Sequence, residues 1–426
     1  MNNQALANDT TANKISYYHL AAFLILLPFD FFYSQLVMIS FAIHTIIHLK
    51  KYRLRLVFSK PVLVVASLYI LGLLGFLYSP DIKEAGNEAT KQLAILLFPI
   101  LLILNGLDLE RYKYGLLKIF GFTCVGTILY LYIDAIHTLH YFHLPLSSLF
   151  TLAFMNHNFA LPIGLHATYM SMYAALSLVS FLYFIHIANT FSQRVLYSFG
   201  IIILGAGLLQ LSSRAVFISL LIIVNFVLPF FLLKGKRRIF FIITAFVFSA
   251  VVLFGIYYID SFKVRYISEL KGDLGKKSMN SEITEPRLLR WKAEMELISK
   301  RPVFGYGSGS EAGLLKEKFF EKQFFISYLQ EFNSHSQYLS FLLKAGIVGL
   351  ALYLYVLYFG LNQAWRKRDI IFMGFMLIIA IVSVSENILD VNKGIFFYSF
   401  FMPVFLLSYS KNSVPTEDES RQPGNL

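Results

Sequence analysis

Cysteine and charge are both scarce in this chain of 426 residues. The single cysteine, Cys124, lies inside an apolar run, so the chain cannot form an intrachain disulfide or a cysteine metal cluster, and the expected role is that of a small packed residue. Only 15% of the residues are charged, whereas 57% are hydrophobic. Soluble globular proteins do not need so much apolar surface, so the composition indicates a polytopic membrane protein.

The features of a cleaved signal peptide are also missing. Residues 1–14 (MNNQALANDTTANK) start polar and uncharged, without the basic segment and the short apolar segment that a signal peptide has. The first apolar helix is therefore expected to remain in the protein.

Long apolar runs follow one another along most of the chain. A helix needs about 20 apolar residues to cross a bilayer, and the run 17–48, which Pro28, Asp30 and Ser34 interrupt, predicts two short spans. Further spans are predicted at 61–79, 92–106, 115–136, 166–188, 195–212, 215–233, 239–258, 337–361, 370–387 and 394–409.

The predicted fold is all-α, with about 12 transmembrane helices. Residues 1–258 are expected to hold helices 1 to 9, and residues 334–409 to hold helices 10 to 12. Between them, residues 259–333 form one large loop with helices of its own. The polar tail 410–426 is expected to be disordered.

Lysine and arginine are unevenly distributed among the short loops. With twelve spans, the loop ending at Arg194 falls on the same side of the membrane as four basic segments, KKYRLR (50–55), ERYK (110–113), KGKRR (234–238) and WRKRD (365–369). The other side holds residues 79–91, of mixed charge, and residues 137–165, which contain neither lysine nor arginine. Basic short loops stay in the cytoplasm. Both termini are therefore expected to be cytoplasmic, and in the inner membrane of a bacterium the large loop faces the periplasm.

The large loop predicts two helices joined by a glycine-rich turn. Residues 292–300 form an amphipathic pattern with Trp291, Met295 and Ile298 on one side, and residues 314–332 predict a second helix. The turn between them, RPVFGYGSGS, is not followed by GK[ST], so a mononucleotide-binding P-loop is not indicated. The turn is instead expected to dock the loop onto the membrane helices.

Three arginines on the outer side are candidates for binding an anion. Arg214 stands in LSSRAVF between two apolar helices, where an arginine either marks a functional site or extends to lipid headgroups. Arg287 and Arg290 in EPRLLRW share one helix face, and a guanidinium presents a fork of donors that suits phosphate oxygens. The alternative for this pair is a solvated helix with Glu285 and Glu294 as its partners.

Histidines and a carboxylate on the same side are further candidates. His335 in NSHSQYL begins a helix, with Tyr338 one turn later, and a neutral imidazole can accept a proton from a hydroxyl. The alternative is a capping or interfacial histidine, because its small polar neighbours suit a helix N-cap. Glu386 ends a span where it can orient an arginine or a histidine. His166 and Tyr169 open another helix at the same face.

Under a topology that other residues determine, all these residues lie on one side of the membrane, which favours a common site. Arginine pairs suit a diphosphate, and a histidine suits the activation of an attacking hydroxyl. No carboxylate pair and no His/Cys set has the spacing of metal ligands, so no metal site is expected.

In their order and spacing, these motifs resemble those of the O-antigen ligase and polymerase superfamily. Arg287, LLR, Trp291 and then KAEMELISKRPVFGYGSG resemble the family's arginine, three residues, tryptophan and a helix ending in Pro and a Gly-x-Gly turn. HSQYLSFLLKAGIVGL resembles its histidine helix, LSSRAVF its S-R turn, SENILDVNKGIFFYSFF its terminal region and HATY its H-x-[ST]-Y element. The chain departs from the family pattern at Ser336, where asparagine is common, and at Lys344, where an acid or a neutral residue is frequent.

The resemblance implies a GT-C-like fold and an inverting, metal-independent glycosyl transfer that uses no cofactor. The implied donor is a glycan on undecaprenyl diphosphate, the acceptor is a lipid A core or another lipid-linked glycan, and the surroundings are membrane lipid; nucleic acid is not a partner. By this resemblance Arg214 and Arg287 stabilise the departing diphosphate, and His335 deprotonates or orients the acceptor hydroxyl. The residues expected to bind substrate are Arg290, His166, Tyr169, Tyr338 and Glu386.

Three functions remain open at this point. An O-antigen ligase moves the glycan to the lipid A core, whereas a polymerase joins it to another lipid-linked repeat unit with the same residues. The HxxYL and RxxxW signatures favour the ligase. A transporter or flippase for lipid-linked sugars predicts charged residues within several spans and a repeat between the two halves, but Lys344 is nearly the only strong candidate within a span and no repeat is visible.

Overall fold

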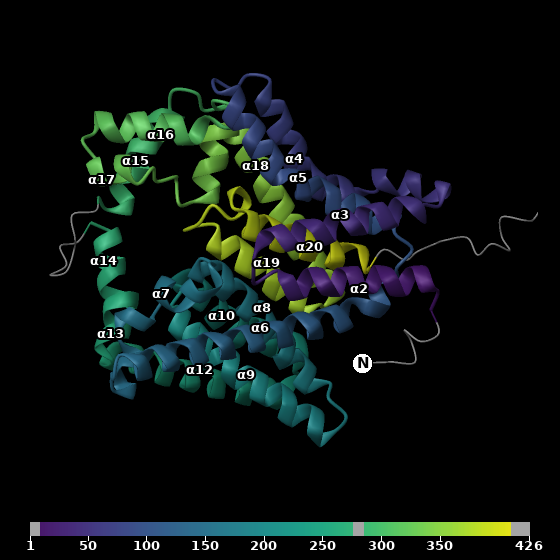
Figure 1. The fold of residues 1–426 in the computed structure, drawn as a ribbon, viewed down its shortest axis with the longest axis vertical. Coiled ribbons are helices and arrows are strands. Elements are labelled where there is room, and N and C mark those ends of the chain that lie inside the picture. Colours follow the sequence, from purple (N-terminus) through teal and green to yellow (C-terminus); the bar gives the residue numbers. More distant parts are fainter. Residues whose placement is uncertain (1–8, 276–284, 410–426) are drawn as a thin grey trace, which may run out of the picture.

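The computed structural model of the chain describes residues 9–275 and 285–409. Within these residues it contains helices and no strand (Figure 1), which confirms the all-α class. The helices before the large loop are α2 (Thr11–Leu26), α3 (Phe31–Ile47), α4 (Lys60–Phe76), α5 (Ile82–Leu104), α6 (Leu109–Tyr141), α7 (His157–Ala160), α8 (Ala167–His186), α9 (Phe191–Leu211), α10 (Arg214–Ile222), α11 (Leu228–Leu232) and α12 (Gly235–Tyr258). The later helices are α13 (Asp260–Lys263), α14 (Glu269–Asp273), α15 (Arg287–Ile298), α16 (Ser310–Glu321), α17 (Phe325–Leu329), α18 (Gln337–Lys367), α19 (Ile370–Val382) and α20 (Asn392–Leu407). The tail 410–426, predicted to be disordered, lies outside the described residues.

Each apolar segment predicted from the sequence contains a helix, but not every helix is long enough to cross a bilayer by itself. In the described part of the chain, seven helices are long and apolar enough, or up to eight if the 3₁₀ helix Lys51–Phe58 and α4, which meet at 65°, form one broken span. Three shorter apolar helices are α3, α19 and α20. A multi-pass membrane protein is thereby confirmed, whereas the number of about 12 spans and the GT-C-like architecture remain predictions.

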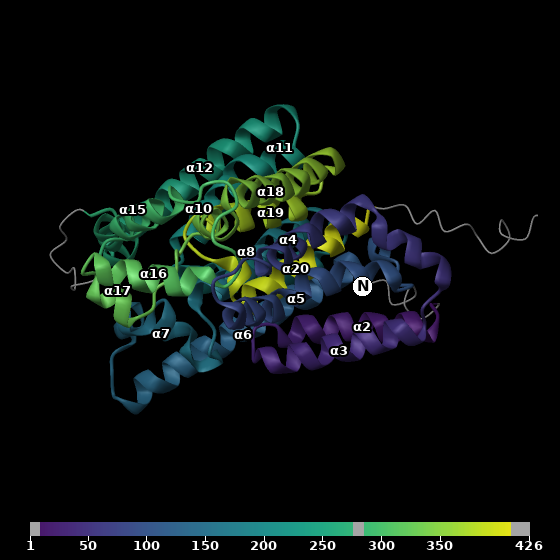
Figure 2. The same cartoon turned by 90° about the horizontal axis from the view of Figure 1, so that it is seen from above.

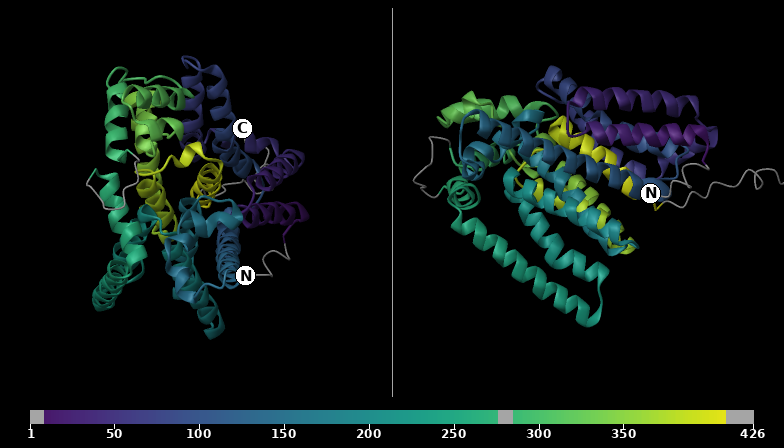
Figure 3. Two further views of the ribbon diagram at one scale, coloured as in Figure 1. Left: turned by 60° about the vertical axis from the view of Figure 1, so that its left-hand side comes forward. Right: turned by 60° about the horizontal axis from the view of Figure 1, so that its bottom comes forward.

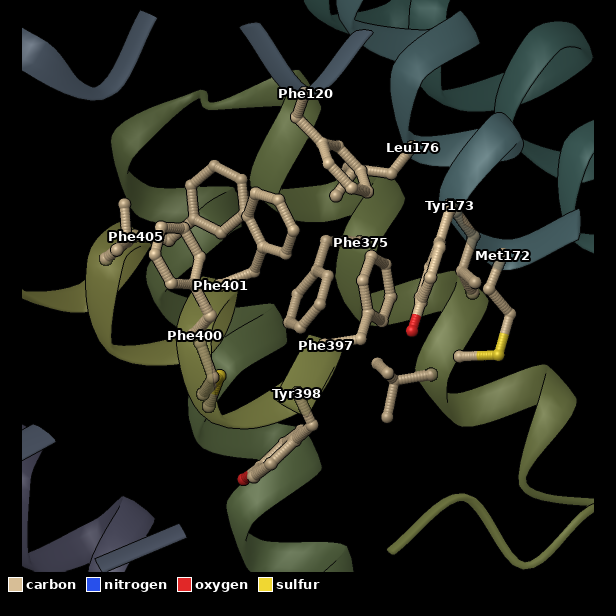
Figure 4. Close-up of a cluster of buried hydrophobic side chains, with 14 of the residues drawn as sticks. Phe120, Met172, Tyr173, Leu176, Phe375, Phe397, Tyr398, Phe400, Phe401 and Phe405 are labelled. Atoms are coloured by element: carbon tan, nitrogen blue, oxygen red, sulfur yellow. The ribbon is translucent and has the colours of Figure 1, made fainter. Parts of the chain in front are cut away.

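The centre of the helical bundle is α20. All its residues from 394 to 407 are buried, and it packs against α5, α8 and α19. Its Phe401 contacts the ring of Phe120 from α6, and its Phe397 contacts the ring of Phe375 from α19 (Figure 4). Helices in lipid gain no hydrophobic energy by meeting, so van der Waals and ring contacts of this kind hold them together. Because protein surrounds α19 and α20, these helices can be shorter than helices that face lipid.

The least enclosed helix of the membrane part is α12. Only 17% of the residues in its most apolar stretch are buried. It contacts α11, the π-helical turn Ile223–Val227 and α13. Figure 2 shows α12 at one edge of the molecule and α2 and α3 at the opposite edge. In the right panel of Figure 3 it stands to one side of the other helices. It leads directly into α13 and α14, the first part of the large loop.

Basic loops meet at one end of the bundle. Arg53 Nη1 donates to the backbone oxygen of Asn105 (2.5 Å), and Lys113 Nζ lies 2.9 Å from Asp369 Oδ2. The helices of the large loop, α15 to α17, lie at the other end (Figure 1). The division of the loops into two sides, predicted from their lysines and arginines, agrees with these contacts. The assignment of the basic end to the cytoplasm remains a prediction.

Both predicted loop helices are present, with different bounds and a different buried side. The first is α15, and the second is divided into α16 and α17 by residues 322–324. The predicted apolar side is wrong at Met295, which is 46% exposed, whereas Ala293, Glu294 and Leu297 are buried. Hydropathy assigns a glutamate to solvent, so the sequence pattern could not reveal a buried carboxylate on α15.

The glycine-rich turn docks onto a break in α18. At Gly346 the backbone leaves the helical conformation (φ 62°, ψ −158°), so neighbouring backbone groups lose their helical partners. Residues of the turn replace them: Tyr306 N donates to Leu343 O (3.0 Å), and Ile347 N donates to Pro302 O (2.8 Å). The predicted docking role of the turn is confirmed. The apolar pattern of 337–361 gave no sign of the break.

Gly346→Ala is expected to destabilise the protein. A Cβ at Gly346 would lie 2.3 Å from the backbone of Val303, and the positive φ disfavours any side chain. The cost should be about 2 kcal/mol or more, visible as a lower apparent melting temperature of the protein in detergent. Gly255→Ala on α12 is the control, because a Cβ there meets no atom within 4 Å. Equal melting temperatures for the two variants would contradict the proposed docking.

Candidate active site

A cavity of about 1170 Å³ lies where the large loop meets the ends of the membrane helices. Six of the eight predicted site residues line it, namely Arg214, Arg287, Arg290, His335, Glu386 and His166. They come from the starts of α8, α10 and α15 and from the segments just before α18 and α20. The structure therefore brings together residues that are far apart in the chain.

Arginines form one wall of the cavity. Arg214 is the first residue of α10, and its Nη2 lies 2.6 Å from Asp273 Oδ2. Arg287 is the first residue of α15, and its Nη1 donates to the backbone oxygen of Ser385 (3.3 Å). This contact ties the start of α15 to the segment that follows α19.

Two further arginines lie on the same wall. Arg290 follows one turn after Arg287, and its guanidinium carbon lies 4.7 Å from the ring centre of Phe332. Burial, together with the charge of Arg287, lowers the pKa of Arg290 to about 10, so it remains cationic at neutral pH. Arg265 lies on the π-helical turn Val264–Ser268 and pairs with Glu269.

Each of the four guanidinium groups has one buried nitrogen without a hydrogen-bond partner among the described residues. The buried nitrogens without a hydrogen-bond partner in the described part of the chain include Arg214 Nη1, Arg265 Nε, Arg287 Nε and Arg290 Nε. A buried donor without a partner is costly. The donors of a guanidinium match the oxygens of an anion in charge and geometry, so the wall is chemically suited to an anionic group.

His335 lines the same cavity, just before α18. Its backbone has φ 45°, a conformation that costs a non-glycine residue about 1–3 kcal/mol. Its side chain is 27% exposed, and its ring lies edge-on to Phe332 with 5.5 Å between ring centroids. The N-cap of α18 is Ser336 and not the histidine. Strained residues gather at functional sites, so the conformation favours a functional histidine over a helix cap.

Glu386 lies beside this histidine. Its Oε2 is 4.0 Å from His335 Nδ1, and its Oε1 accepts a hydrogen bond from Thr168 Oγ1 (3.4 Å). Burial by itself would raise the pKa of Glu386, but His335, His166 and Arg287 outweigh burial and hold the pKa below its usual range. The carboxylate is therefore ionised at neutral pH and lies within reach of the imidazole.

His166 forms a second imidazole pair with His157. His166 is the N-cap of α8: its Nδ1 accepts from Thr168 N (3.3 Å), and its ring centroid lies 4.0 Å from that of His157. Burial lowers the pKa of both histidines, that of His157 to about 4. Both rings are therefore neutral at pH 7 and can exchange hydrogen bonds with sugar hydroxyls.

Tyr169 and Tyr338 are not among the described residues that line the cavity, and their role in binding substrate remains a prediction. Tyr169 is buried in the hydrophobic core behind His166, with 5.7 Å between the ring centroids. Tyr338 donates its hydroxyl hydrogen to the backbone oxygen of Ala380 (2.8 Å). Both support the helices that carry the site.

Arg265 and His157 are among the residues of the cavity wall that sequence reasoning missed. Arg265 lies in a loop rich in both signs of charge, where an arginine is normally solvated, so no local signal distinguishes it. His157 stands in the segment 137–165, which contains neither lysine nor arginine. The signal that could have identified His157 as a site residue was its position between two predicted spans, on the same outer side as the other candidates.

Glu294 on α15 is a buried acid behind the histidine. It accepts a hydrogen bond from Ser334 Oγ. Burial, with a further contribution from Glu311, raises its pKa from 4.5 to about 8. The folded state therefore holds a proton that the unfolded chain releases above pH 4.5, and this group lowers stability as the pH rises from 4.5 towards 8.

Glu294→Gln should remove this part of the pH dependence. Glutamine keeps an acceptor for Ser334 but has no proton to lose, so the variant should lose less apparent thermal stability than the unmodified protein between about pH 5 and pH 8. Melting temperatures across this range test the prediction. Glu317→Gln, at an exposed position of α16, is the control. Parallel curves for the unmodified protein and Glu294→Gln would exclude a protonated Glu294.

The fold and the cavity define a multi-pass helical membrane protein with an arginine-lined site at one end of its bundle. Residues 199–354 match the family model Wzy_C, described as O-antigen ligase. This match confirms the resemblance to the O-antigen ligase superfamily, whose members are glycosyltransferase-like enzymes. The matched residues include Arg214, the large loop and His335. No curated protein matches the chain.

Proposed function

We propose that the protein is an O-antigen ligase, which moves a glycan from undecaprenyl diphosphate to a sugar hydroxyl of the lipid A core. The observation that carries the proposal is the cavity, whose wall combines four arginines with a histidine–carboxylate pair. A departing diphosphate needs positive charge, and an attacking hydroxyl needs a base. The family match supports a reaction of this class.

The arginines bind the diphosphate and stabilise it as it leaves. When the bond between the anomeric carbon and the diphosphate oxygen breaks, negative charge develops on that oxygen. The guanidinium groups of Arg214 and Arg287 stabilise this charge, and Arg290 adds a third contact to the diphosphate. Guanidinium groups that the fold holds in place do not have to reorganise during the reaction, which makes them effective. Since they supply the positive charge, the proposed transfer is metal-independent.

His335 takes the proton of the attacking hydroxyl. As the acceptor oxygen forms its bond to the anomeric carbon, its proton moves to the neutral imidazole. Glu386 stabilises the imidazolium that results, as the carboxylate of a catalytic triad does. Attack on the face opposite the diphosphate inverts the configuration of the sugar. The neutral imidazole of His166 offers a hydrogen bond to a hydroxyl of the substrate.

A lipid donor suits the place of the cavity. Ile218 of α10 and Ile381 of α19 belong to its apolar lining, next to the arginine wall. A polyprenyl chain can therefore stay in the bilayer while its diphosphate reaches the guanidinium groups. We assign this end of the bundle to the periplasmic side of the bacterial inner membrane and both termini to the cytoplasm, because basic loops meet at the other end.

Glycan transfer by the purified protein tests the proposal. The donor is a lipid-linked glycan, and separate reactions offer the lipid A core or a second lipid-linked glycan as acceptor. Product on the lipid A core supports the ligase. Product on the second lipid-linked glycan alone identifies a polymerase that uses the same cavity. Absence of product with both acceptors contradicts the proposed function.

In this assay His335→Ala should lower the rate of transfer by about 100-fold or more, because a positioned base contributes about 10²–10⁴-fold. The variant should still insert into the membrane and bind donor, since the arginines are unchanged. His140→Ala, at an exposed position near the end of α6, is the matched control. Full activity of His335→Ala would exclude the role of base.

Arg287→Lys should also lose activity, by about 10²-fold in rate. Lysine keeps the charge but cannot donate two parallel hydrogen bonds to phosphate oxygens. Arg237→Lys, at an exposed position near the start of α12, should transfer glycan normally. If Arg287→Lys is as active as the unmodified protein, Arg287 contributes charge alone.

A further inference from the structure

Side chains from two other elements hold the residues on either side of His335. Ser334 N donates to Glu311 Oε1 of α16 (2.9 Å), and Ser336 N donates to Asn387 Oδ1 (2.8 Å), in the segment between α19 and α20. Asn387 Nδ2 also donates to the same oxygen of Glu311 (2.9 Å). One carboxylate and one amide thus connect the residue before the histidine with the residue after it.

The histidine depends on these contacts because its own backbone conformation is unfavourable. At φ 45° a residue with a side chain is stable only where its surroundings hold it. A local hydrogen bond from His335 N to Asn333 Oδ1 (3.0 Å) contributes, but it comes from the same short loop and can move with it. Without the anchors at 334 and 336, the loop would relax and the imidazole would leave its place beside Glu386.

A buried ion cluster holds Glu311 in turn. Its Oε2 lies 3.6 Å from Lys344 Nζ and accepts a hydrogen bond from Ser340 Oγ. Lys344 also pairs with Asp390 (2.9 Å) and with Glu88. Displacing Glu311 would separate its carboxylate from a buried ammonium, which is costly, so the cluster keeps Glu311 in place.

Among the described residues, those that line the cavity include His335 but not Glu311, Asn387 or Lys344. The supporting residues therefore have no route to the substrate from their positions. Any effect that they have on the reaction must pass through neighbours that line the cavity, namely His335, which their hydrogen bonds flank, and Glu386, which precedes Asn387.

We propose that Glu311 and Asn387 are positioning residues, which hold His335 in its left-handed backbone conformation and keep its imidazole in the cavity beside Glu386. The inference rests on the proposed function, in which His335 is the base. A misplacement of about 1 Å can lower a rate by about 10²-fold. Loss of either anchor should therefore lower kcat, while KM for the donor, which the arginines of other elements determine, should stay the same.

The test compares two substitutions of one residue in the full-length protein. Glu311→Ala removes the acceptor of Ser334 N and should lower kcat by about 10–100-fold with little change in donor KM. Glu311→Gln keeps a side-chain oxygen at this point and should restore most of kcat. Glu317→Ala, an exposed glutamate on the same helix, is the control and should behave like the unmodified protein. Binding of farnesyl diphosphate to each purified variant shows that the arginine wall has formed.

Asn387→Ala gives an independent measurement if Glu311→Ala does not fold, because it removes the anchor at Ser336 without changing a charge. It should show the same loss of kcat at constant donor KM. Unchanged kcat in Glu311→Ala or in a folded Asn387→Ala overturns the proposal, as does a Glu311→Gln variant that is as slow as Glu311→Ala. These outcomes differ from failure of the proposed function, in which the unmodified protein itself transfers no glycan.

Discussion

The ion cluster around Lys344 is the interaction on which the site depends. A lysine inside an apolar bundle is costly unless acids pair with it, and each acid that does so brings a different element to the same point. Glu88 comes from α5, Glu311 from α16 and Asp390 from the segment before α20. Glu88 also accepts a hydrogen bond from Gly309 N of the glycine-rich turn (2.6 Å). Satisfying one buried charge therefore joins the large loop to three parts of the membrane domain.

Backbone hydrogen bonds complete this junction. The break at Gly346 would leave peptide groups of α18 unpaired, and the turn of the large loop pairs with them. The large loop is therefore not a separate domain but a part of the same packed structure. The cavity forms at this junction, where polar groups that cannot face lipid have been gathered and where a charged substrate can be accommodated.

The arginines and the histidine of the cavity are held in position in different ways. Its arginines come from the starts of α10 and α15 and from the π-helical turn before α14, so several rigid elements set their mutual spacing. The histidine, in contrast, stands in a short loop and needs outside support to hold its conformation. A diphosphate tolerates small differences in the positions of the charges around it, whereas proton transfer requires a hydrogen bond of defined geometry. This difference explains why a dense polar network surrounds the histidine loop.

Predictions from the sequence were most successful where they relied on the apolar runs and on the side of the membrane that each loop faces. Long apolar runs predicted the helices, and their alternation with basic loops placed Arg214 and His335 on one side although 120 positions separate them, from 214 to 335. The predictions could not tell which surroundings each of two nearby residues on one helix faces. Tyr169 lies three residues after His166 and packs into the core, and Met295 on α15 is exposed while Glu294 is buried. Rotation of a helix about its own axis depends on its partners, which a single segment does not contain.

The amino-acid sequence by itself determined the class of the protein, the location of its helices and six of the residues that line the cavity. These properties follow from composition, from local hydrophobic patterns and from the chemistry of single side chains. The tertiary structure alone decided that Lys344, an apparent departure from the family pattern, lies at the centre of an ion cluster, and that the N–H of Ser336 binds Asn387. It also decided that Arg265 joins the cavity wall. Contacts between residues far apart in the chain depend on how helices pack in three dimensions, and the sequence around either partner does not specify that packing.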